Sequence, residues 1–111
     1  MSIIYHLTPA DHWHSLDPAA PYLPAAFEND GFIHCTRGLD SLLQVANTFY
    51  RDAPGEFLLL AIAEERLSVE VKYEDGFPHV YGPLNRDAIV AVHRMGRRAD
   101  GSFEAPEENR V

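Results

Sequence analysis

The sequence has few of the features that mark secreted or membrane proteins. Its 111 residues include a single cysteine, Cys35, so no intrachain disulfide can form, which is typical of the reducing cytoplasm. Its longest apolar run extends only from Phe57 to Ala63, well short of the ~20 residues that span a bilayer. Neither a basic segment nor a small-residue cleavage site follows Met1, so we expect no export signal. These features predict a cytoplasmic protein without a transmembrane helix.

Basic residues are also scarce. Lysine and arginine total 9 against 17 acidic residues, and the resulting formal net charge of −8 repels phosphate backbones and anionic lipids. We therefore expect neither bulk nucleic acid nor a membrane surface among its partners. The hydrophobic share of 46% and the aromatic share of 11% are enough for the core of one domain. We place that globular domain at residues 1–95 and expect 96–111 to form a polar C-terminal tail, with Phe103 as the residue able to hold it.

The pattern of apolar residues predicts one main helix among several strands. Leucine, alanine and aromatic residues recur at steps of three and four between Leu39 and Tyr50, which places an apolar stripe on one helix face. The run from Phe57 to Ala63 is typical of a central strand covered on both faces. Further strands are predicted at residues 3–7, 32–36, 69–73, 79–81 and 88–92, and a shaped, proline-rich loop at 17–26. This order of elements indicates a single α+β domain with a mostly antiparallel or mixed sheet.

Three histidines lie on predicted strands, and each shares its strand face with a hydroxyl-bearing residue two positions away. The pairs are His6 with Thr8, His34 with Thr36, and His79 with Tyr81. We therefore expect the three imidazoles to converge in one cleft. Taken singly, each histidine is equally typical of a hydrogen-bonded structural residue. No pair of histidines has the spacing of a recognised metal site, so we expect no bound metal.

The residues that follow His34, together with the absence of known motifs, limit the reactions that the protein could catalyse. Cys35 follows it directly and so points to the opposite face of the strand. The two side chains cannot form a thiolate–imidazole dyad without a bulge, and we interpret Cys35 as a small buried hydrophobe. Arg37 lies by the start of the predicted helix, where it is suited either to bind an anion or to form a surface ion pair with Asp40. The sequence contains no nucleophile elbow, phosphate-binding glycine loop or dinucleotide fingerprint. Standard hydrolase, P-loop and Rossmann functions are therefore not indicated.

Four blocks of the sequence resemble a known family. The blocks are Ile4-Tyr5-His6, Gly31-Phe32-Ile33-His34-Cys35-Thr36, Val45-Ala46-Asn47 and Phe77-Pro78-His79-Val80-Tyr81-Gly82-Pro83-Leu84. They make the chain similar to the small bacterial and plant proteins called domain of unknown function 952, over residues 3 to about 95. Members of that family resemble the ADP-ribosyltransferase fold, a split sheet whose central cleft holds a dinucleotide in the true transferases and in the related RNA 2′-phosphotransferases.

The resemblance implies positions for some site residues. In the transferases a histidine or arginine on the first strand contacts the nucleotide, and a second polar or aromatic residue follows on a later strand. His6 matches the first position and His34 the second. A third motif of those enzymes often supplies a glutamate, and no glutamate of this chain matches it. A structure with Glu28, Glu70 or Glu74 within reach of the His6 and His34 rings would favour an enzyme over a binding protein.

The combined prediction is a protein that binds a small nucleotide-like ligand, with NAD or an ADP-ribose relative as the candidate. The candidate catalytic residues are His34 and His79. The candidate ligand contacts are His6, Thr8, Thr36, Arg37 and Tyr81, with Arg37 or the helix start taking a phosphate and Tyr81 stacking on a ring. Two alternatives stand beside this prediction: an NAD-dependent ADP-ribosyl- or 2′-phosphotransferase-like enzyme, and a structural or protein-interaction domain.

Overall fold

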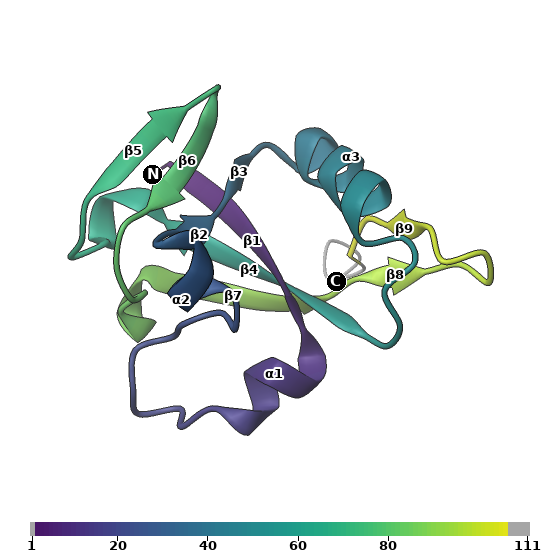
Figure 1. Cartoon of the computed structure of the whole chain (residues 1–111), viewed down its shortest axis with the longest axis horizontal. Coiled ribbons are helices and arrows are strands. Elements are labelled where there is room, and N and C mark those ends of the chain that lie inside the picture. Colours follow the sequence, from purple (N-terminus) through teal and green to yellow (C-terminus); the bar gives the residue numbers. More distant parts are fainter. Residues whose placement is uncertain (1, 107–111) are drawn as a thin grey trace.

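The computed structural model describes residues 2–106 of the chain. The elements follow one another as β1 (Ile3–Pro9), α1 (Ala10–Ser15), α2 (Phe27–Asp30), β2 (Ile33–His34), β3 (Thr36–Arg37), α3 (Leu39–Phe49), β4 (Phe57–Ala63), η1 (Glu64–Arg66), β5 (Val71–Glu74), β6 (Phe77–Val80), η2 (Arg86–Ala88), β7 (Ile89–Arg94), β8 (Gly96–Arg97) and β9 (Phe103–Glu104) (Figure 1). All of these strands pair in antiparallel fashion, which makes the chain a small single-domain α+β protein with several sheets and few helices. None of the described helices is long and apolar enough to cross a membrane.

The main sheet has the strand order β3-β1-β4-β7. Its strand β4 is buried at every position, as its continuous apolar run predicts, because it lies between β1 and β7. Strand β1 pairs with β4 over its whole length, from Ile3 opposite Ala63 to Pro9 opposite Phe57. Every second side chain of β1 is buried, and His6 is one of these. The alternation along β1 therefore directs His6 into the protein.

The second sheet has the order β2-β6-β5. Strands β5 and β6 form a hairpin whose two-residue turn, Asp75-Gly76, has positive φ angles of 53° and 83°. This left-handed backbone matches the twist of the flanking strands, and Asp-Gly is among the sequences that adopt it most readily. The turn sets the register that places Lys72 opposite His79. It thereby determines which side chains of β5 lie beside His79.

The strand predicted at residues 32–36 is divided between the two sheets. Strand β2 pairs with β6, whereas β3 pairs with β1. Between them the backbone N–H of Cys35 donates to the carbonyl of Pro78, 3.1 Å away. The structure thus corrects the prediction of one continuous strand, because long-range backbone hydrogen bonds decide which sheet each half joins. Figure 1 shows this segment leading from β2 to the edge of β1.

Apolar side chains fill two clusters, one on each face of the main sheet. On one face, Ile4 of β1 and alternate residues of β4 pack with Tyr22 from the proline-rich loop and with Val80 of β6. On the other face, Leu59 packs with Leu42 and Ala46 of α3. The two helix residues belong to the apolar stripe that predicts α3, and a buried leucine contributes about 2 kcal/mol. The second sheet therefore covers one face of the main sheet and α3 the other.

The chain beyond β7 forms a small hairpin, β8–β9, in the first part of the expected polar tail. Phe103 is buried there, and its ring stands perpendicular to that of Phe57 at a centroid distance of 5.4 Å. Arg97 ties the hairpin to the loop after α3, because its guanidinium donates to the carbonyls of Tyr50, Arg51, Ala53 and Gly55. The part of the expected tail at residues 107–111 lies outside the described residues.

Candidate functional site

A cavity of about 620 Å³ lies alongside β1. Its walls come mainly from β1, α3, the loop between α1 and α2, and the strands β2, β3 and β6. Many of its lining side chains are apolar, including Leu42, Val45 and Phe49 of α3, and none of the described lining residues is a lysine or arginine. Volume and lining are typical of a site for a small organic molecule.

The cavity exists because β3 pairs with only the first half of β1. The ladder between them ends once Ile4 lies opposite Arg37 and Tyr5 opposite Thr36. The chain then departs at Cys35 into the second sheet. In the described part of the chain, the half of β1 that follows Tyr5 therefore has no neighbouring strand on this side.

The free edge of β1 directs the backbone of Leu7 toward the cavity. Even-numbered residues here bond toward β4, since the N–H of Ala10 donates to Glu56 at 2.9 Å. Odd-numbered residues therefore direct their N–H and C=O to the opposite edge, where Tyr5 pairs with β3. Leu7 lines the cavity, and among the described residues it has no backbone hydrogen bond on that edge. Its N–H and C=O are thus available to a ligand.

His6 joins the two sheets at the wall of the cavity. Its Nδ1 lies 2.7 Å from the carbonyl oxygen of His34, so Nδ1 carries the proton and donates. Its Nε2 lies 2.9 Å from the hydroxyl of Tyr22 and accepts from it. Burial lowers the pKa of His6 to about 4, although the hydrogen bond to the His34 backbone opposes this change. At neutral pH, His6 is therefore an uncharged bridge between β1, β2 and the loop that carries Tyr22.

Tyr22 is a wall residue that sequence reasoning did not single out. Its backbone N–H and C=O both bond to Leu84, at 2.9 and 3.0 Å. Its side chain is fully buried, and this burial raises its pKa to about 12, while a hydrogen bond with Thr8 acts in the other direction. The apolar and aromatic content of the proline-rich loop was the available signal that this segment is packed. It did not reveal which residue faces His6.

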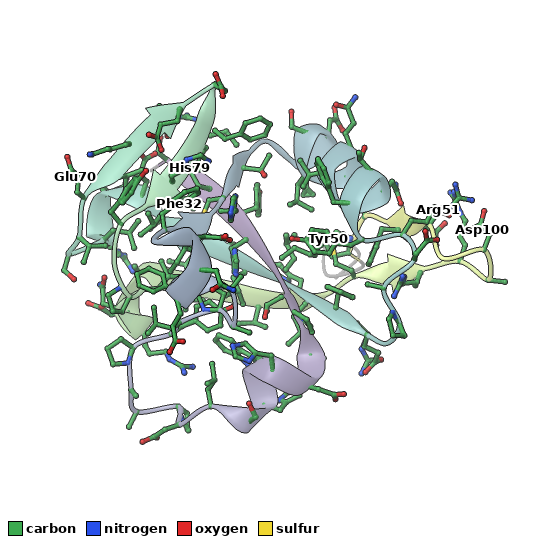
Figure 2. All side chains as sticks on the ribbon, in the orientation of Figure 1. Phe32, Tyr50, Arg51, Glu70, His79 and Asp100 are labelled. Carbon is green, nitrogen blue, oxygen red and sulfur yellow. The ribbon has the colours of Figure 1, made fainter. Side chains whose placement is uncertain are left out.

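Two histidine–carboxylate pairs line or adjoin the cavity on the side of the second sheet. Nε2 of His34 lies 3.0 Å from Asp30, and Nδ1 of His79 lies 2.6 Å from Glu74. The two imidazole rings are 5.4 Å apart, and Phe32 stacks on His79 with 4.1 Å between centroids. Figure 2 shows Phe32 beside His79. Phe32 is a second lining residue that the sequence analysis did not propose as part of the site.

The structure brings together five of the predicted site residues. His6, Thr8, His34, Thr36 and His79 all line the cavity. They come from β1, β2, β3 and β6, so the three histidines reach one space from separate segments. Their roles toward a ligand remain predictions.

Tyr81 and Arg37 do not line this cavity. The Tyr81 ring lies 5.3 Å from that of Phe32, and its hydroxyl donates to Glu74. Arg37 lies in a separate surface hollow, where it donates to the Tyr73 hydroxyl at 3.2 Å. Its acidic neighbour is Glu64, at 3.9 Å, and not Asp40 as one alternative predicted. A phosphate in the cavity would therefore lie away from Arg37.

The structure also shows which histidine ring Glu74 contacts and whether acidic, histidine and cysteine side chains cluster. Within residues 2–106, Glu74 is the glutamate that reaches a histidine ring, and that ring is His79 rather than His6 or His34. The same residues contain no group of three or more histidine, cysteine, aspartate or glutamate side chains arranged to hold a metal ion. Cys35 is buried, as predicted for a small hydrophobe.

Comparisons with known proteins give a family and a fold. The family model described as protein of unknown function (DUF952) matches residues 7–92. The crystal structure of protein CC0527 from Caulobacter crescentus is similar with a TM-score of 0.79 and 27% identity, over 93% of this chain and 94% of that chain. The solution NMR structure of CC0527 has a TM-score of 0.72 and 28% identity, over 91% and 90% of the two chains. No curated protein matches.

Proposed function

This chain belongs to the DUF952 family of proteins of unknown function, and from its cavity we propose that it binds a small nucleotide-like ligand related to NAD or ADP-ribose. We also propose that the divided sheet is an ADP-ribosyltransferase-like arrangement. The division between β2 and β3 supports this, because it leaves an open cleft beside the first strand.

The observation that carries the proposal is the free backbone edge at Leu7. An N–H and a C=O that face an apolar cavity cost about 1–3 kcal/mol each when they remain unpaired. A primary carboxamide satisfies both at once, because its oxygen accepts from the N–H and its amino group donates to the C=O. The nicotinamide ring of NAD carries such a group. The edge of β1 is therefore complementary to the nicotinamide end of the ligand.

The walls of the cavity suit a flat heteroaromatic ring. Phe32, Phe77, Phe49 and Tyr50 all line it, and Phe49 is 74% exposed, although an aromatic ring usually gains from burial. In the view of Figure 2, Tyr50 lies at the end of α3, across from Phe32. Aromatic faces on both sides of an open cavity favour stacking of a base or a pyridine ring, which contributes about 1–3 kcal/mol.

Charge decides which part of the ligand enters. The cavity lining has no lysine or arginine among the described residues, His6 is neutral, and the whole chain carries −8. A buried phosphate would find no fixed cation there. The nucleoside end of the ligand is therefore expected inside, with its phosphates toward solvent near His34, whose side chain is 59% exposed.

A matched ligand pair tests the proposal. Nicotinamide and nicotinic acid have the same ring, but the carboxylate of nicotinic acid has no donor for the carbonyl of Leu7 and adds a negative charge. Isothermal titration and thermal shift should show nicotinamide and NAD binding, with nicotinamide at least about tenfold tighter than nicotinic acid. Equal affinity for the amide and the acid, or no binding of nicotinamide, NAD or ADP-ribose, contradicts the proposal.

The second candidate function is an NAD-dependent transferase-like enzyme. Glu74 supports it only through His79, a candidate catalytic residue, because this carboxylate does not reach His6 or His34. Enzymes of this kind release nicotinamide when the bond to ribose breaks. Incubation of the protein with NAD and chromatography for free nicotinamide distinguishes the two functions. A pure binding protein returns NAD unchanged.

We further propose a cytoplasmic location. Cys35 is free and buried, and its burial raises the pKa of the thiol. A thiol kept in its protonated form without a disulfide partner supports a reducing compartment. Fractionation of cells that produce the protein tests this location.

A further inference from the structure

A carboxylate holds His79 in one tautomer. The Oε1 atom of Glu74 lies 2.6 Å from the Tyr81 hydroxyl and 2.6 Å from Nδ1 of His79. The hydrogen bond from Tyr81, and then that from His79, lowers the pKa of Glu74, so the carboxylate is ionised and accepts both bonds. Nδ1 of His79 therefore carries the proton, and Nε2 is left without one in the neutral ring.

The ring of His79 is also fixed from its face and by its strand. Phe32 stacks on it at an interplanar angle of 23°. The hairpin register places Lys72 opposite His79, and the ammonium of Lys72 lies 4.9 Å from the centre of the Tyr81 ring. Only 16% of the His79 side chain is exposed. The ring is thus held in place before any ligand binds.

Nε2 is the part of His79 that remains available. The described residues offer it no hydrogen-bond partner, and His79 lines the cavity. We propose that Glu74 is a positioning residue for His79, and that this dyad presents Nε2 to the cavity as the acceptor for a hydroxyl group of the ligand. The inference rests on the proposed function, because the ribose of a nucleotide-like ligand supplies that hydroxyl. The dyad accordingly selects ligands that carry a ribose.

The pair of His34 and Asp30 provides a matched control. Here too a carboxylate contacts a ring nitrogen, since Asp30 lies 3.0 Å from Nε2 of His34. The centres of the His34 and His79 rings are 5.4 Å apart. More than half of the His34 side chain is exposed, so this contact orients its ring weakly. Asp30→Asn therefore removes one nearby carboxylate charge without touching Glu74, whereas Glu74→Gln removes the charge that acts on His79.

Diethyl pyrocarbonate tests the dyad without any ligand. The reagent transfers an ethoxycarbonyl group to an accessible unprotonated imidazole nitrogen and releases ethanol and carbon dioxide. Peptide mass spectrometry gives the rate at each histidine, with the exposed His14 as the internal reference. We expect His79 to react measurably but more slowly than the exposed His14, and Glu74→Gln to slow it further, by about tenfold relative to His14. Asp30→Asn should leave that ratio unchanged.

The physical reason is that the glutamine amide can donate to Nδ1, which moves the proton to Nε2 and blocks attack there. Lack of reaction at His79, or the same rate ratio in Glu74→Gln, overturns the inference. Long-range proton–nitrogen NMR of the unmutated protein provides a second test, which does not require any variant to fold. It should show Nδ1 protonated and Nε2 unprotonated, and the opposite tautomer also overturns the inference.

A ligand comparison separates this inference from the binding proposal. Nicotinamide has no hydroxyl group, so its affinity should be the same for the unmutated protein and Glu74→Gln. NAD should lose about tenfold in the variant, the value of one good hydrogen bond. Unchanged NAD affinity in the variant counts against the dyad, whereas failure of nicotinamide itself to bind counts against the proposed function.

Discussion

Nδ1 of His6 donates to the carbonyl oxygen of His34 at 2.7 Å, and this bond joins the main sheet to the second sheet. If the register of β1 and β3 continued, Leu7 would lie opposite His34 and its N–H would face that carbonyl. The imidazole takes the place of this ladder bond. The cavity beside Leu7 and the bridge at His6 are thus two consequences of the same division of the strand segment.

Removal of the bridge should destabilise the fold. His6→Ala removes the donor to the His34 carbonyl and the acceptor of the Tyr22 O–H, and each of these lost hydrogen bonds costs about 1–3 kcal/mol. We expect a loss of about 2–4 kcal/mol in the free energy of unfolding, measured by urea denaturation. His6→Asn keeps a side-chain donor and should lose less. An alanine variant as stable as the unmutated protein would show that the bridge is not needed.

The same residue predicts a pH dependence. The pKa of His6 is about 4 in the folded protein, against an ordinary value of 6.5 in the unfolded chain, so between these values the unfolded chain binds the extra proton. Stability from this group is complete above that ordinary pKa and falls as the pH decreases toward 4, by about 3 kcal/mol in total. Urea midpoints at about pH 7 and about pH 4.5 should differ in this direction. In His6→Asn, which cannot take up this proton, the difference should shrink.

The local pattern of the sequence predicted the elements that need only local information. The buried strand β4 is predicted by its continuous apolar run. Helix α3 is predicted by apolar residues at helical spacing, of which Leu42 and Ala46 are buried in the core. Alternation along short strands also placed His6, His34 and His79 toward a common space. These predictions depend on the spacing of apolar and polar residues along one segment. That spacing can be read without knowing which distant segments the element contacts.

The features that sequence reasoning missed depend on contacts between distant segments. The bond from Cys35 to Pro78 divides the predicted strand, and the pairing of Tyr22 with Leu84 brings a loop to His6. Local composition indicates that this loop is packed, but it identifies neither of these two backbone pairings. Arg37 lies in the surface hollow with Glu64, a partner that is distant in the sequence and adjacent only in the folded protein.

The His34 side chain should affect the ligand and not the fold. The bridge from His6 ends on the main-chain carbonyl of His34, which alanine keeps, and the imidazole itself contacts Asp30 in an exposed position. His34→Ala should change the free energy of unfolding by less than about 0.5 kcal/mol. It should also weaken NAD binding at least about tenfold by calorimetry. Unfolding of this variant, or unchanged affinity, would make His34 a structural or uninvolved residue.

Arg97 should stabilise the C-terminal hairpin through its shape as well as its charge. Its planar guanidinium donates to several carbonyls of the loop after α3 and lies 4.3 Å from the centre of the Phe103 ring. Lysine keeps the charge but has no planar fork, so Arg97→Lys should cost about 2 kcal/mol in urea unfolding. Arg94→Lys is the control, because Arg94 is exposed and forms a surface ion pair with Glu56. Equal losses in both variants would contradict the prediction.

A larger side chain in the cavity should block binding without harming the fold. Val45 lies on α3, lines the cavity and is half-buried, whereas its neighbour Gln44 is exposed and does not line it. Val45→Trp places a large ring in space that the ligand needs, and an open cavity of about 620 Å³ accepts it without compression of the core. We expect nicotinamide and NAD binding to be lost in calorimetry, while the free energy of unfolding changes by less than about 1 kcal/mol. Gln44→Trp adds the same ring on the solvent side and should leave binding unchanged. If Val45→Trp binds NAD as the unmutated protein does, the ligand occupies another place, and the open edge of β1 at Leu7 is not its site.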